Sequence, residues 1–95
     1  EQVRSNIDRI DQQIVALIAE RSDYVKQTAA LKTTTADVRA PQRVEQVIGK
    51  VRSLATSADA SPAVVEATYR AMIGAFIELE LQSLEDSSSE LDPHK

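Results

Sequence analysis

The chain of 95 residues has no cysteine, two glycines, three prolines and three aromatic residues. Because it has no thiol, it forms no disulfide and offers no thiolate as a nucleophile or metal ligand. No apolar run approaches the ~20 residues that cross a bilayer as a helix, so we expect no membrane partner. With 42% hydrophobic and 27% charged residues, the composition excludes disordered, collagen-like and disulfide-scaffold chains and fits one folded domain.

The net charge of −4 is concentrated near the C-terminal end. Residues 78–92 hold six acids and no base, whereas residues 1–77 hold nine acids and ten bases. Nucleic-acid-binding proteins usually present a basic face with aromatic side chains for base stacking. The aromatic residues here are limited to Tyr24, Tyr69 and Phe76, so we expect no nucleic-acid partner.

The few helix-breaking residues divide the chain into helices. Pro41 follows a threonine-rich stretch, and Ser61-Pro62 is typical of a helix start, with serine as the N-cap and proline at the first helical position. The alternation typical of strands is absent. We therefore predict an all-α chain of three helices, with a long first helix. Their expected ranges are about 2–32, 41–57 and 62–86.

We expect one helical domain over residues 1–85 and a mobile, acidic, serine-rich tail over residues 86–95. The connection from Thr33 to Ala40 is either an ordinary linker or a lid. Because the chain begins at Glu1 without a methionine, we expect that an upstream segment has been removed or omitted. The protein is then cytoplasmic, or exported if that segment was a signal peptide.

The first helix carries an apolar seam whose members recur at spacings of three and four, which indicates helix–helix packing. The seam consists of Val3, Ile7, Ile10, Ile14 and Leu17. A helix over 2–32 is ~45 Å long, whereas a compact domain of this size has a radius of gyration of about 12 Å. We therefore predict an intertwined homodimeric helical bundle with the long helices packed along each other. A compact monomer with a kinked first helix is the alternative.

Cations lie on the first helix where its periodicity predicts aliphatic residues. Arg21 lies between Ile18 and Val25 on one stripe, and Lys32 follows eleven residues after Arg21. Eleven residues are about three turns, so both side chains should project the same way, roughly 16 Å apart. Arg4 lies on the same stripe but is too far from Lys32 of its own chain to share a small ligand with it.

Glu80 continues an apolar face of the third helix. That face consists of Tyr69, Ile73, Phe76 and Ile77. Unpaired charges in a core are costly, so a small polyanionic ligand between the helices would relieve the cost. The structural alternatives are that Arg21 reaches past the core into water, that Lys32 interacts with its helix C-terminus, and that Glu80 forms an interhelical salt bridge. Arg43 alone would be an ordinary surface arginine.

These residues occur in segments that resemble the all-helical, AroQ-class chorismate mutase family over about 85 of the 95 residues. The segments are VRSNIDRIDQQIVALIAER, with an arginine near its start and at its end, DYVKQTAALK, VRAPQRVEQVI and AFIELELQ. The resemblance implies an intertwined dimer of three-helix chains that converts chorismate to prephenate. It implies neither a cofactor nor a metal.

Carried over by residue, the resemblance places Arg21, Lys32, Arg43 and Glu80 in one substrate pocket, with Arg4 contributed across the dimer. Arginine binds the two substrate carboxylates bidentately, and Lys32 donates to the ether oxygen. A glutamate such as Glu80 donates only when it is protonated. The resemblance thus implies that Lys32, Glu80 and Arg21 are catalytic.

Val44 departs from the family pattern, because many members carry an acid there that contacts the substrate's ring hydroxyl. The segments APQRV and DYVK resemble the branch of isochorismate-pyruvate lyases, which form salicylate. We expect chorismate mutase activity, with Val44 lining the site, and isochorismate-pyruvate lyase activity as the alternative. An aminodeoxychorismate mutase and a non-catalytic, dimeric helical interaction module remain open.

Overall fold

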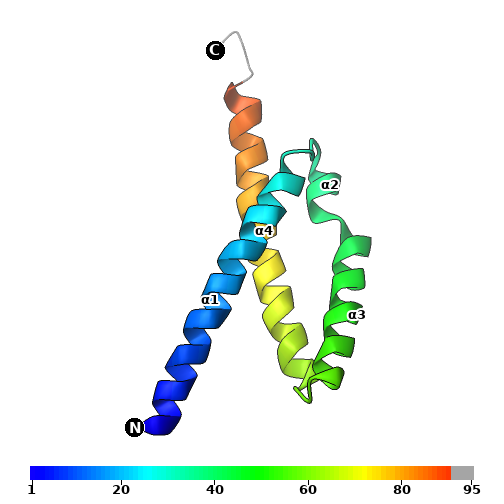
Figure 1. The fold of residues 1–95 in the computed structure, drawn as a ribbon. Coiled ribbons are helices and arrows are strands. Elements are labelled where there is room, and N and C mark those ends of the chain that lie inside the picture. Colours follow the sequence, from blue (N-terminus) through cyan, green and yellow to red (C-terminus); the bar gives the residue numbers. More distant parts are fainter. Residues whose placement is uncertain (91–95) are drawn as a thin grey trace. The chain divides into compact units, whose positions relative to one another are not determined.

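The computed structural model describes residues 1–90, and within them no strand occurs, so the predicted all-α class is confirmed (Figure 1). Three long helices and one short helix follow one another along the chain. They are α1 (Gln2–Ala29), α2 (Thr35–Arg39), α3 (Pro41–Ser57) and α4 (Pro62–Glu90). The chain divides into two compact units, of which the first is Glu1–Lys32 and the second begins at Thr33.

The first unit consists of α1 and the turn that ends it. None of the 28 residues of α1 is buried, and the apolar seam is exposed along its length, from Val3 at 69% to Leu17 at 63%. The helix ends three residues before the predicted position. The backbone amides of Leu31 and Lys32 instead bond to the carbonyls three residues earlier, at 3.1 and 3.0 Å, so a tight final turn carries Lys32 past the helix.

The second unit is built on the packing of α2 and α3 against α4. α3 and α4 lie side by side and run in opposite directions, joined by a short turn (Figure 1). The buried core of the second unit is small and consists of Val38 from α2 with Ile48, Val51 and Ala55 from α3. The α3 residues follow one another at spacings of three and four, so they form one stripe of that helix.

Local capping explains where the helices of the second unit begin. The Ser61 hydroxyl accepts a hydrogen bond from the amide of Val64 at 3.2 Å, which confirms the predicted N-cap of α4. The Thr34 hydroxyl accepts from the amide of Asp37 at 3.0 Å and so caps α2. The threonine-rich connection therefore contains a five-residue helix that we did not predict. Ala40 alone joins α2 to α3, with left-handed backbone angles of φ 32° and ψ 61°.

α4 is longer than predicted, because it continues to Glu90. Residues 86–90, which we assigned to a mobile tail, are therefore helical in this structure. The rest of that predicted tail, residues 91–95, lies outside the described residues. Within residues 1–90, no helix combines the length and the hydrophobicity that a membrane crossing requires.

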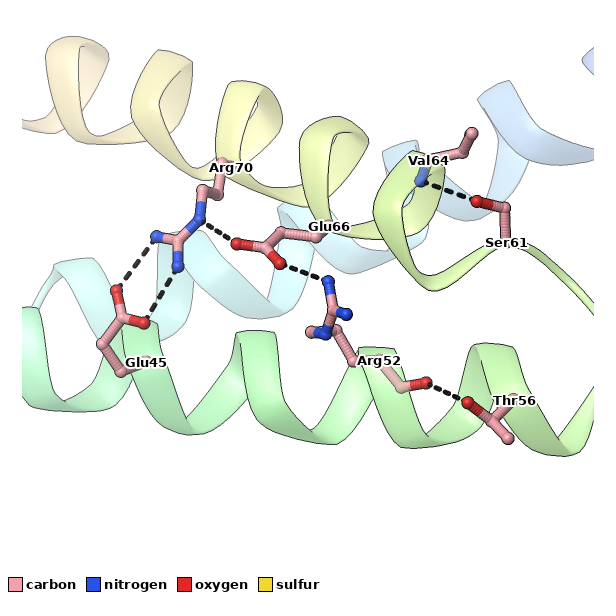
Figure 2. A network of polar contacts seen from close by, with 7 residues as sticks. All are labelled: Glu45, Arg52, Thr56, Ser61, Val64, Glu66 and Arg70. Atoms are coloured by element: carbon pink, nitrogen blue, oxygen red, sulfur yellow. Dashed lines mark hydrogen bonds and ion pairs between the residues drawn. The ribbon is translucent and has the colours of Figure 1, made fainter.

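A network of four charged side chains connects α3 to α4 (Figure 2). Arg70 donates from both terminal nitrogens to the two Glu45 oxygens, at 2.9 Å each, and from Nε to Glu66 at 2.7 Å. Arg52 donates to the other Glu66 oxygen at 2.6 Å. These hydrogen bonds lower the pKa of Glu45, through Arg70, and that of Glu66, through Arg70 and Arg52, below the ordinary value of 4.5.

This network predicts a specific loss of stability in acid. Because the pKa values of Glu45 and Glu66 are lowered in the folded state, their contribution is present above pH 4.5 and is lost as the pH falls through the folded-state values. Arg70→Gln should remove most of that contribution. The urea midpoint of the variant should therefore lie below that of the wild type at pH 7, and the difference should shrink towards pH 3. A difference that is constant with pH would contradict this assignment.

Candidate functional site

Three of the predicted site residues belong to the first unit. Arg21 is half-buried on α1, and Lys32 is half-buried just beyond the helix. The predicted spacing of ~16 Å assumed a continuous helix, so the tight turn after Ala29 changes the direction of Lys32. Arg4 is exposed, with a side-chain exposure of 84%, and pairs with Glu1 at 3.2 Å.

The position of Arg4 along α1 agrees with the expectation that it cannot serve its own chain's Lys32. The helix runs 25 residues from Arg4 to its end at Ala29, which corresponds to ~37 Å, and Lys32 lies beyond that end. The guanidinium of Arg4 is therefore too far from Lys32 of the same chain for both side chains to bind one small ligand. The first unit by itself therefore places Arg21 and Lys32 near one end and Arg4 near the other.

The other three predicted residues belong to the second unit. Arg43 lies in the first turn of α3 and is exposed, while Val44 beside it is half-buried. Glu80 is half-buried on α4. The apolar residues of its predicted face are likewise half-buried: Tyr69, Ile73, Phe76, Ile77 and, one turn later, Leu84. The prediction that Glu80 continues this face is confirmed.

The pairing of Glu45 with Arg70 sets the register between the two helices that carry Arg43 and Glu80. Glu80 lies ten residues beyond Arg70, and Arg43 lies two residues before Glu45. Because the helices are antiparallel, both steps lead towards the same end of the hairpin. The backbones of Arg43 and Glu80 are thus about 12 Å apart along the helix axes, a gap that long side chains and a small ligand can fill.

The structure thus assigns Arg4, Arg21 and Lys32 to one unit and Arg43, Val44 and Glu80 to the other. Within the second unit, a cation and a carboxylate from packed helices lie at one end of the hairpin. A single pocket that joins the two sets stays a prediction. Among residues 1–90, no group of histidine, aspartate and glutamate side chains has the arrangement of a metal site.

Sequence reasoning missed the Arg70 network. Glu66 and Arg70 are four residues apart, a spacing that favours an ion pair on one helix and could have been recognised. Their pairing with Glu45 and Arg52 depends on how α3 lies against α4, and no local pattern contains that information. The four residues of the network connect α3 to α4 near Arg43, and we assign none of them a role in a reaction.

Comparison with known proteins identifies a family and a similar protein. The sequence model of the family described as chorismate mutase type II matches residues 3–81. The isochorismate pyruvate lyase of Pseudomonas aeruginosa is 41% identical over 46 residues, which are 48% of this chain and 46% of the relative. The chain therefore spans about half the length of this curated relative. No solved structure matches the chain significantly.

Proposed function

The chain belongs to the chorismate mutase type II family, and we propose that it catalyses the rearrangement of chorismate to prephenate. The observation that carries this proposal is the extent of the family match, because residues 3–81 include every predicted site residue. Those residues are Arg4, Arg21, Lys32, Arg43, Val44 and Glu80.

The reaction is one concerted, intramolecular step. The ether C–O bond breaks while a new C–C bond forms, and negative charge accumulates on the ether oxygen. Such a reaction needs no covalent intermediate and no cofactor. The protein has to hold the chair-like conformer of the substrate and stabilise that oxygen. A set of cations facing one protonatable carboxyl suits both requirements.

We assign roles by the chemistry of each side chain. Arg21 and Arg43 bind the substrate carboxylates through their planar guanidinium groups. Lys32 donates a hydrogen bond to the ether oxygen as its charge develops. Glu80, in its protonated form, donates to the same oxygen, and its place on a half-buried face limits competition from water. Arg4 of a second copy completes the carboxylate contacts.

We include a second copy of the chain because α1 has no buried residue. Its apolar seam is exposed, and an exposed apolar stripe with alternating spacings of three and four is typical of a surface that packs on another helix. α4 also carries apolar residues on several faces, with Val64 and Leu79 more than 60% exposed. Helices of this kind are usually buried on several sides. We therefore propose a homodimer with α1 at its centre.

Replacing one seam residue by a charge tests the dimer. Ile14→Asp should shift the protein from dimer to monomer in sedimentation velocity, because a carboxylate in an apolar helix interface is left without solvation. Gln12→Asp, on another face of α1, is the control and should leave the sedimentation coefficient unchanged. A wild type that sediments as a monomer, or a dimer that survives Ile14→Asp, would contradict the homodimer.

Replacing Arg21 tests the enzymatic proposal. With chorismate as substrate, Arg21→Ala should lower kcat/KM by roughly 100-fold or more, as expected when a charge-assisted contact in a closed site is lost. Its helical circular dichroism should stay close to that of the wild type. Arg9→Ala, an exposed arginine of the same helix, is the matched control and should retain activity.

An interaction module without catalysis gives a different result. The wild type would then convert neither chorismate nor isochorismate, and Arg21→Ala would mainly lower the stability of the protein. Thermal melting with an oxabicyclic transition-state mimic separates the two cases. A ligand that binds only the native state raises the melting temperature, whereas a module whose charges form salt bridges between chains shows no shift.

Isochorismate pyruvate lyase is the second candidate, supported by the similar relative from Pseudomonas aeruginosa and by Val44. An aliphatic, half-buried side chain at that position cannot accept a hydrogen bond from a ring hydroxyl. Both reactions develop charge on the same ether oxygen, so one set of cations serves either. Assays with chorismate and with isochorismate distinguish them, because only the lyase releases salicylate and pyruvate.

The proposed role of Glu80 predicts a pH dependence. Activity should fall as the pH rises, because the ionised carboxylate cannot donate to the ether oxygen. Glu80→Gln keeps a donor at every pH and should flatten the alkaline limb of the kcat/KM profile. Glu78→Gln, at an exposed position of the same helix, is the control and should reproduce the wild-type profile. An alkaline limb that is unchanged in Glu80→Gln would reject the proton-donor role.

A further inference from the structure

The first turn of α3, which carries Arg43 and Val44, begins with Pro41 but has no side-chain cap. Ala40 at its N-cap has a left-handed backbone and provides no side-chain hydrogen bond. Left-handed angles are unfavourable for alanine, particularly before a proline. The buried residues of α3 begin only at Ile48. This turn therefore has no side-chain cap and no fully buried residue of its own.

Glu45, the residue that follows Val44, connects this turn to α4. Glu45 accepts two parallel hydrogen bonds from Arg70 of α4, with both N–O distances at 2.9 Å. Figure 2 shows the guanidinium of Arg70 lying between Glu45 and Glu66. A bidentate pair of this kind restricts direction as well as distance, so it connects the start of α3 to α4 in one geometry.

Arg70 is itself held from the other side. Its Nε donates to Glu66 at 2.7 Å, one turn earlier on the same helix, and Glu66 is held in turn by Arg52 at 2.6 Å. The guanidinium is planar and all three of its nitrogens are occupied, so few rotamers satisfy these contacts together. The carboxylate of Glu66 is the least exposed of the four groups, with a side-chain exposure of 26%.

We propose that Arg70 is a positioning residue, which holds the first turn of α3 through Glu45 and so aims Arg43 at a substrate carboxylate. The inference rests on the proposed function, because it takes Arg43 as a substrate-binding residue. Arg70 does not touch the substrate.

Steady-state kinetics of Arg70→Gln tests this inference. KM should rise about three- to tenfold, for whichever of chorismate and isochorismate the wild type converts, because a displaced binding group weakens a contact without altering the reactive groups. The value of kcat should change less than about twofold. Arg70→Lys should fail to restore KM, because an ammonium group keeps the charge but cannot form the two parallel hydrogen bonds.

Arg52→Gln is the matched control. It removes a different hydrogen bond to Glu66 at a similar exposure, 46% against 43% for Arg70, and leaves the contact between Arg70 and Glu45 intact. Its KM should stay within about twofold of the wild type, although its melting temperature falls. A purely structural network would lower the melting temperature of both variants and leave both KM values unchanged.

Glu45→Gln covers the case in which Arg70→Gln does not fold, because it preserves the pair between Arg70 and Glu66. It should show the same rise in KM. An active wild type with an unchanged KM in Arg70→Gln and Glu45→Gln overturns the positioning role alone, as does an equal rise in Arg52→Gln. A wild type that converts neither substrate overturns the proposed function and this inference together.

Discussion

The exposure of the apolar seam on α1 is the constraint on which the rest of this protein depends. Each half-exposed aliphatic side chain leaves on the order of 1 kcal/mol of burial free energy unrealised. Five such residues amount to roughly 5 kcal/mol, a large share of the ~5–15 kcal/mol that stabilises a typical domain. The absence of any buried residue in α1 therefore supports the proposed requirement for a partner surface. In the proposed dimer, the same requirement brings Arg4 of one chain to the site of the other.

The second unit meets a different requirement, which is to hold charged groups at defined positions on a small core. Exposed ion pairs usually contribute little to stability, so the network around Arg70 has a modest stabilising effect for its size. Its bidentate geometry restricts where the start of α3 can lie. In the proposed site, which binds two carboxylates, a displacement of one arginine by about 1 Å lowers activity more than it lowers stability.

Most of the fold could be predicted from the sequence because its signals are local. Pro41 and the Ser61-Pro62 pair identified the starts of α3 and α4, and the capping bond of Ser61 confirms the reason. The end of α1 was less accurate, since no breaker lies between Ala29 and Lys32. α2 was missed because five residues are too few for periodicity. Only the spacing of Thr34 and Asp37, typical of a capping motif, could have indicated it.

The sequence by itself determined the helical class, the apolar seam of α1 and the place of Glu80 on a continuous face of α4. These follow from periodicity and capping, which act within a few residues. Only the tertiary structure decided that Arg70 binds Glu45 and that α3 begins on a left-handed alanine. Residues that are 25 positions apart in sequence meet through the register of two packed helices, and that register is a property of the whole interface between them.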